Sequence, residues 1–570
     1  MQKNLKLSTL FAGAILALTA LANTAQAQTA KRPRLAVVIV VDQLRADYLD
    51  RFDDLFLPPG TSGRDAGGFR YLRERGAQFP SARYKHFPLF TALGHAVVST
   101  GGYPYKTGIV GNEWFDVATR KPMYSVADES AKVVTDDKSS TATPMSPRNL
   151  RSSTLGDELK MATGGRAKVV SLALKDRPAI LLGGRLSDAS IWFDDSTGNW
   201  ISSDFYCKTN RLPAWVETLN ARKMPASRFG QTWASSVNMA SVASHTWKPS
   251  GAPPLRPIYG LGAQFPHPID GGVAAPGQNY YKAWTLTPWA NQFVFDTAEQ
   301  AVQSEQLGRD ETPDLLAFNL ATNDYVGHAF GPDSPEVMDI SVATDRQLSQ
   351  FFRFLDRAVP GGLANVTIAL TADHGVSPIP EDLQASGFRS GRIQETAVIS
   401  AAQNALSAKF GAGEWILDYV EPTLYLDNDA LAKAGANPQD AQQIAARAIA
   451  KLDGIYDTYT RTQIETGALL RNDIGARLSL GFHPKVSGDV MVITESNYFI
   501  EPAPFKNNTT HGTVYSYDTQ VPMLLAGAGI RAGTYREDVG PADIAPSLAA
   551  ILGISRPSAC DGTPLVSALR

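Results

Sequence analysis

Residues 35–42 have the sequence LAVVIVVD, in which seven apolar residues lead directly into the carboxylate of Asp42. A continuous apolar run of this length, rich in β-branched residues, is typical of a strand buried on both faces, as in a parallel sheet covered by helices. Ligands of such sheets bind beyond the carboxyl ends of the strands, where Asp42 falls. This stretch therefore predicts a buried parallel sheet with functional side chains along one edge.

Similar apolar runs recur along the chain, and several of them end in polar residues: Lys168–Leu174, Leu315–Leu320, Val366–Thr371, Val490–Thr494 and Val521–Ala526. Helical patterns cover Pro335–Asp356, Ala430–Leu452 and Ala542–Leu552. The alternation of buried strands with helices indicates an α/β fold, and we expect a three-layer α/β/α sandwich with a mostly parallel central sheet.

The first 27 residues have the features of a signal peptide. Lys3 and Lys6 precede an apolar run from Leu10 to Leu21, and Ala25-Gln26-Ala27 provides a cleavage site between small residues. We therefore expect the mature protein to be periplasmic or secreted. No other stretch is long and apolar enough for a membrane span, so we expect no membrane contact after cleavage.

Residues 28–570 are expected to form one domain, with insertions over the functional edge of the sheet at about 185–290 and 380–485. The formal net charge is −3 and the chain has no long basic run, which argues against nucleic acid as a binding partner.

Cys207 and Cys560 are the only cysteines, and neither is near a histidine motif, so thiolate ligands are not expected. The sequence leaves open whether they form a disulfide.

Six side chains in short polar segments have the chemistry of metal ligands. Asp324 and His328 are four residues apart, so on a helix they share one face and can bind one ion. Each pattern alone also has a structural explanation, such as a capping aspartate or a loop histidine. Together they provide three carboxylates and three imidazoles, which suit two zinc ions, with manganese or iron as alternatives. The six residues are Asp42, Asp324, His328, Asp373, His374 and His511.

Thr91 is the candidate nucleophile because it lies where a loop enters a predicted helix. A hydroxyl at a helix N-terminus lies near amides that favour anions, and a metal ion can hold it as an alkoxide. The alternative is that Thr91 only caps the helix. His95 would lie one turn further along, and we expect it to have a structural role.

These segments resemble the alkaline phosphatase superfamily, and most closely its nucleotide pyrophosphatase/phosphodiesterase-like branch. The resemblance covers most of the chain after the leader. Its segments are Phe90-Thr91, residues 100–104 and 107–112, residues 323–328 with Gly331-Pro332, residues 371–375, His511-Gly512, residues 543–548 and residues 561–565.

The resemblance implies two zinc sites, one formed by Asp324, His328 and His511. It implies that the other is formed by Asp42, Asp373 and His374, with Thr91 bridging toward it. It also implies that Asn112 donates a hydrogen bond to a phosphoryl oxygen. The sequence gives no indication of a third ion.

Lys175-Asp176-Arg177 resembles the Lys-x-Arg of phosphate-irrepressible alkaline phosphatases with a threonine nucleophile. Two cations aimed at the non-bridging oxygens favour a monoester dianion over a diester. We therefore expect a zinc-dependent alkaline phosphatase that hydrolyses small phosphate monoesters through a phosphothreonine intermediate. The alternatives are a phosphodiesterase or nucleotide pyrophosphatase on the same scaffold and, more remotely, a metal-binding protein without catalysis. The chain has no Cys-x-Pro-x-Arg, which disfavours a sulfatase.

Overall fold

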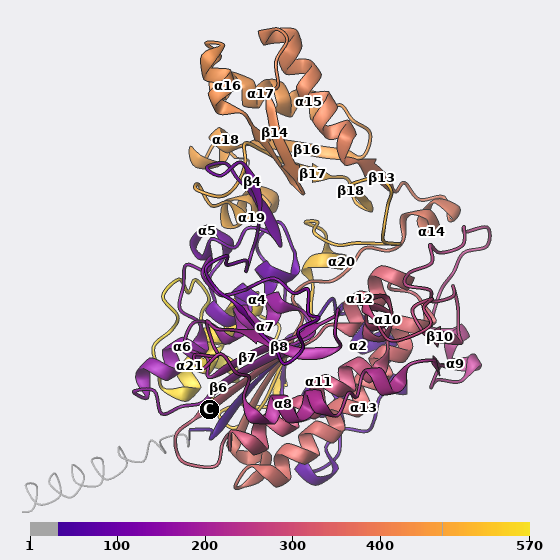
Figure 1. The fold of residues 1–570 in the computed structure, drawn as a ribbon, viewed down its shortest axis with the longest axis vertical. Coiled ribbons are helices and arrows are strands. Elements are labelled where there is room, and N and C mark those ends of the chain that lie inside the picture. Colours follow the sequence, from indigo (N-terminus) through magenta and orange to yellow (C-terminus); the bar gives the residue numbers. More distant parts are fainter. Residues whose placement is uncertain (1–31, 470) are drawn as a thin grey trace, which may run out of the picture.

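A computed structural model describes residues 32–469 and 471–570 and places a ten-stranded sheet at the centre of the molecule (Figure 1). Five neighbouring strands are parallel, in the order β12-β1-β11-β6-β7. Their bounds are Val366–Thr371 (β12), Leu35–Val41 (β1), Asp314–Leu320 (β11), Val169–Ala173 (β6) and Ala189–Asp194 (β7). The register pairs Val41 with Leu320 and Val40 with Thr371, so the segments that follow these strands emerge at one edge. The predicted mostly parallel sheet is confirmed.

The remaining strands extend this sheet at both ends, and several of them are antiparallel to their neighbours. They are β19 (Met523–Gly527), β2 (Ala77–Gln78) and β20 (Gly533–Thr534) beside β12, and β8 (Asn199–Ser203) and β5 (Val133–Val134) beside β7. β7 and β8 belong to the sheet, although they fall within the first expected insertion at about 185–290. The rest of that expected segment follows Ser203. It contains α8 (Ala214–Ala221), β9 (Gln231–Trp233), α9 (Met239–His245), β10 (His267–Ile269) and α10 (Gln278–Thr285).

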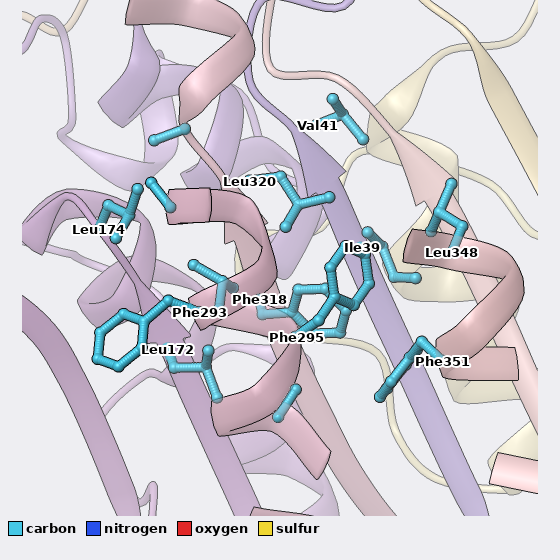
Figure 2. Close-up of a cluster of buried hydrophobic side chains, with 14 of the residues drawn as sticks. Ile39, Val41, Leu172, Leu174, Phe293, Phe295, Phe318, Leu320, Leu348 and Phe351 are labelled. Carbon is cyan, nitrogen blue, oxygen red and sulfur yellow. The ribbon is translucent and has the colours of Figure 1, made fainter. Parts of the chain in front are cut away.

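Alternate residues of β1 enter two different hydrophobic cores. Leu35, Val37 and Ile39 pack in the core that contains α11 (Pro288–Ser304) and α13 (Pro335–Ala358), where Figure 2 shows Ile39 near Phe295, Phe318 and Phe351. Ala36, Val38 and Val40 pack in the core on the opposite face, with α6 (Leu155–Ala162) and α21 (Ile544–Leu552). Burial on both faces explains the unbroken apolar sequence of β1 and gives the three-layer arrangement.

The second insertion forms a cap with its own hydrophobic core, at the top of Figure 1. Its four-stranded sheet has the order β14-β15-β17-β16, and α15 (Glu395–Phe410) and α17 (Pro438–Ile449) pack on it. The strands are Ile416–Val420 (β14), Thr423–Leu426 (β15), Ile455–Thr460 (β16) and Val490–Thr494 (β17). The assignment of Val490–Thr494 to the central sheet was therefore wrong.

One predicted helix differs from the structure. The helix expected over Ala430–Leu452 is two helices, α16 (Asn428–Lys433) and α17, because Gly435 has a positive φ of 68° and Pro438 starts the second helix.

The disulfide that the sequence left open is not formed, since Cys207 and Cys560 are both free. The leader lies outside the described residues, among which no helix has the length and apolarity needed to span a membrane.

Candidate active site

The predicted metal ligands converge at the edge where the parallel strands end. Asp42 follows β1, Asp324 lies in the first turn of α12 (Thr322–Phe330) after β11, and Asp373 follows β12. Ligand atoms within 4.8 Å of one another form two buried groups: Asp324, His374 and His511, and Asp42, Asp373 and His374. His328 Nε2 lies 3.2 Å from Asp324 Oδ1. The six predicted ligands therefore surround one small volume, and the stacking of the His374 and His511 rings at 3.5 Å places His374 between the two groups.

Each of the three histidines presents one defined nitrogen to this volume. The Nδ1 atoms of His328, His374 and His511 lie 2.8, 2.9 and 2.9 Å from backbone carbonyl oxygens. A carbonyl oxygen only accepts hydrogen bonds, so Nδ1 carries the proton and Nε2 keeps its lone pair. This is the second-sphere contact that orients metal-binding imidazoles.

The donor atoms also fit cations because several of them are buried without a partner. Asp42 Oδ1, Asp373 Oδ2 and His374 Nε2 have no hydrogen-bond partner among the described residues. Burial and the neighbouring Asp42 raise the pKa of Asp373 well above its ordinary value, and burial lowers the pKa of His374 to about 4. Unpaired buried carboxylate and neutral imidazole atoms are costly unless a cation binds them. The residues present therefore fit divalent metal ions.

Lys175 lies between the two groups of ligands. Its Nζ donates to Asp42 Oδ2 at 2.9 Å and to Asp324 Oδ2 at 2.6 Å, and it lies 5.1 Å from the centre of the Tyr325 ring. The ammonium group thus contacts one carboxylate from each metal group. Sequence reasoning assigned Lys175 to phosphoryl oxygens and did not predict these two carboxylate contacts.

Thr91 is buried and is the first residue of α4 (Thr91–Thr100). The N-cap position belongs to Phe90, so the alternative in which Thr91 only caps the helix is wrong. Asn112 lies at the same helix end, where its Oδ1 accepts a hydrogen bond of 3.0 Å from the amide of Ala92. This bond leaves the amino group of the Asn112 side chain to donate elsewhere.

His95 has the expected structural role. Its Nδ1 donates to the Thr91 carbonyl at 2.7 Å, and its Nε2 lies 3.0 Å from Asn319 Nδ2. Asn319 Nδ2 in turn donates to Asp42 Oδ2 at 3.2 Å. The buried chain of contacts connects the helix that carries the candidate nucleophile with a candidate metal ligand.

Sequence reasoning missed Gln43, which contacts both metal groups. Its backbone amide donates to Asp373 Oδ1 at 3.0 Å, and its Nε2 donates to Asp324 Oδ1 at 2.7 Å. Its backbone has a φ of 62°, in the left-handed region that non-glycine residues seldom adopt. A Cβ atom at Gly327 would lie 1.8 Å from Gln43 Oε1, so the glycine makes room for this side chain. The only signal in the sequence is its position after Asp42.

Arg177 lies at the start of α7 (Asp176–Gly183), after β6, and is half-buried. With Lys175, Tyr124 and Tyr325 it lines a cavity of about 330 Å³. Its Cζ atom lies 5.2 Å from the centre of the Tyr124 ring. The guanidinium is thus a cation beside the metal groups that faces an open space.

Comparisons with known proteins agree with this geometry. The family model described as type I phosphodiesterase / nucleotide pyrophosphatase matches residues 36–514. Alkaline phosphatase PhoV of Synechococcus elongatus is 32% identical over 550 residues, which cover 95% of this chain and 94% of that protein. Alkaline phosphatase PafA of Elizabethkingia meningoseptica is 32% identical over 547 residues, which cover 94% of this chain and 95% of that protein.

The fold also matches a solved structure. The crystal structure of wild-type alkaline phosphatase PafA superposes with a TM-score of 0.83 at 31% identity, and the match covers 95% of this chain and 99% of that chain. The residues matched by the family model include the strand ends and all six candidate metal ligands, which lie between residues 36 and 514. The chain therefore belongs to the alkaline phosphatase superfamily.

Proposed function

We propose that this protein is an exported, zinc-dependent alkaline phosphatase that hydrolyses small phosphate monoesters. The observation that carries the proposal is the placement of Arg177 and Lys175 beside the two metal groups. A monoester dianion has three non-bridging oxygens, and the cations provide charge-assisted donors for them. The alkaline phosphatase names of the relatives PhoV and PafA support the same activity. The predicted signal peptide supports export to the periplasm or beyond.

In this proposal Thr91 is the nucleophile. Its Oγ1 forms a bond to phosphorus while the bond from phosphorus to the ester oxygen breaks, and the alcohol leaves after taking up a proton. Water then attacks the phosphothreonine, which returns the Thr91 hydroxyl and releases inorganic phosphate. Asn112 donates its free amino hydrogen to a phosphoryl oxygen during both steps, and Arg177 binds the remaining non-bridging oxygens.

The proposed metal ligands are Asp324, His328 and His511 for one zinc ion and Asp42, Asp373 and His374 for the other, with Thr91 beside the second set. Bound zinc would supply Lewis-acid charge that lowers the pKa of the attacking hydroxyl and stabilises negative charge on the phosphoryl group. Lys175 and Gln43 hold the ligand carboxylates in place from the protein side. Among the described residues no third group of this kind is present.

The test compares kcat/KM for p-nitrophenyl phosphate with kcat/KM for methyl p-nitrophenyl phosphate, a diester with the same leaving group. We expect the monoester to be preferred and Thr91→Ala to abolish nearly all turnover of both substrates while the melting temperature stays close to that of the wild type. A preference for the diester would make the phosphodiesterase the better assignment. No turnover of either substrate by the zinc-loaded protein would leave the non-catalytic alternative.

A further inference from the structure

Arg177 is a cation without an ion-pair partner in the part of the chain that the structure describes. Among the described residues, no carboxylate lies within ion-pair distance of its guanidinium, and no hydrogen bond leaves its side chain, so the buried Nε lacks a partner. Lys175 differs, because its ammonium bonds two carboxylates. The one cation–π contact that the structure gives the Arg177 guanidinium is the ring of Tyr124. The direction in which Arg177 points therefore depends on that ring.

The hydroxyl group of Tyr124 is in turn held by a hydrogen bond to Asp176. Its hydroxyl donates to Asp176 Oδ1 at 2.6 Å, and the same oxygen accepts the backbone amide of Arg177 at 2.6 Å. Burial, followed by the charge of Asp176, raises the pKa of Tyr124, so the hydroxyl stays protonated and donates. The contacts form a closed ring: the Tyr124 hydroxyl binds Asp176, Asp176 binds the Arg177 amide, and the Arg177 guanidinium returns to the Tyr124 ring.

The face of an aromatic ring can hold a cation in place while leaving it able to bind an anion. A carboxylate partner would occupy guanidinium N–H groups and cancel their charge. An aromatic face attracts the cation through its quadrupole and leaves the N–H groups free. Arg177 can therefore keep its donors available for the phosphoryl oxygens.

We propose that Tyr124 is the positioning residue for Arg177 and, through it, sets the preference for phosphate monoesters. Tyr124 acts by orienting the guanidinium into the cavity that it shares with Lys175 and Tyr325, and Asp176 fixes the orientation of Tyr124. The inference rests on the proposed function, in which Arg177 binds the oxygens of a monoester dianion.

The test is a double-mutant cycle with Tyr124→Leu, Arg177→Ala and the combined variant. The readouts are kcat/KM on p-nitrophenyl phosphate and methyl p-nitrophenyl phosphate and the inhibition constant of inorganic phosphate. We expect Tyr124→Leu to lower kcat/KM on the monoester and to weaken phosphate inhibition by about 3- to 30-fold, with a smaller loss on the diester. In the Arg177→Ala background, Tyr124→Leu should lower kcat/KM on the monoester by less than about 2-fold, because the guanidinium that Tyr124 orients is absent.

Tyr124→Phe separates the two parts of the side chain, because it keeps the ring and loses the hydroxyl. It should show a smaller loss than Tyr124→Leu, of about 2- to 10-fold. Tyr206→Phe is the matched control, since it removes a buried hydroxyl that donates to the Gly184 carbonyl at 3.0 Å outside the candidate site. This control should retain the monoester preference of the wild type, and a loss of preference equal to that of Tyr124→Phe would contradict the proposal.

The inference is overturned if Tyr124→Leu costs as much in the Arg177→Ala background as in the wild type, or if it lowers monoester and diester turnover equally. Failure of the proposed function has a different signature. It would appear in the wild type itself as a preference for the diester, whereas the coupling between Tyr124 and Arg177 would still be measurable with phosphate as the probe.

Discussion

Buried and half-buried histidines in this protein differ in how their ring nitrogens are used. His328, His374 and His511 each bind a backbone carbonyl through Nδ1 and direct Nε2 to the candidate metal volume. His95 uses both nitrogens in hydrogen bonds. His86 is buried between the rings of Tyr84 and Tyr103, and neither of its nitrogens has a hydrogen-bond partner among the described residues.

His86 therefore gives a prediction for acid stability. Burial, and then the charge of Arg477, lowers the pKa of His86 to about 3, whereas an unfolded histidine titrates near 6.5. A lowered pKa means that the contribution to stability is present above pH 6.5 and is lost as the pH falls toward 3, because only the unfolded chain takes up the proton. The contribution of His86 should fall by about 2 kcal/mol between pH 7.5 and 5.

The measurement is urea unfolding of the wild type and His86→Phe at these two pH values. Between pH 7.5 and pH 5, the free energy of unfolding of His86→Phe should fall by about 2 kcal/mol less than that of the wild type, because phenylalanine takes up no proton. An identical pH dependence in the two proteins would show that His86 is not kept neutral by burial.

Lys175 and Arg177 give a second prediction at this scale. A charged hydrogen bond to a reacting group is worth about 2–4 kcal/mol, so each loss should lower kcat/KM on monoesters by about 30- to 1000-fold. In the double variant Lys175→Ala/Arg177→Ala, kcat/KM should therefore fall steeply on p-nitrophenyl phosphate. It should fall less on the matched diester, on which only the loss of the Lys175 contacts to Asp42 and Asp324 is expected to act. Equal losses on the two substrates would assign the pair to structure or general anion binding. A greater loss on the diester would favour the phosphodiesterase.

At the scale of elements, the site depends on how closely α4 approaches the end of β12. A Cβ atom at Gly94 would lie 2.4 Å from the carbonyl oxygen of Asp373 and 2.5 Å from its Cβ atom. Only a glycine lets the helix of the candidate nucleophile pass this close to Asp373, a candidate metal ligand. Gly94→Ala should therefore move Thr91 and Asp373 apart.

We expect Gly94→Ala to cost about 1–3 kcal/mol of stability, as for other overpacked positions, and to lower kcat and metal content together. Gly277→Ala is the control, because Gly277 has an extended backbone and a Cβ atom added there would meet no other atom within 4 Å. Urea unfolding and metal analysis of the two variants are the measurements. Equal effects at the two positions would contradict the account of close packing.

The elements also show how much of the fold could be predicted. The strands β1, β11 and β12 could be predicted because burial on both faces leaves an unbroken apolar run, and in each case a carboxylate follows within four residues. Val490–Thr494 has the same pattern but lies in the cap, because apolar runs report burial and not the sheet that provides it. Tyr124 was missed, since one tyrosine in a short strand carries no periodic signal. Its role appears only when Asp176 and Arg177 lie against it.

At the scale of the whole molecule, the candidate metal volume is shared by four segments that are far apart in the sequence, at residues 42, 324–328, 373–374 and 511. Ions that bind only the folded state stabilise it by mass action. Removal of the ions should therefore lower the melting temperature as well as abolish turnover.

The measurement is thermal unfolding and p-nitrophenyl phosphate turnover before and after dialysis against a chelator, followed by addition of zinc. We expect about two zinc ions per chain and recovery of both properties with zinc. In His511→Ala or Asp373→Asn, metal content should be lower at the start and the chelator should change the melting temperature less. Full activity of the metal-free wild type would exclude the two-metal mechanism.

The spread of these ligands along the chain also sets the order in which they leave the ribosome. Asp42 and Thr91 emerge first, Asp324 and His328 follow much later, and His511 is the last of the six candidate ligands to emerge. A product that ends before His511 still carries Thr91, Lys175 and Arg177, but lacks one of the six candidate donors. If the six donors act together as proposed, phosphatase turnover would report only on chains whose synthesis has passed His511.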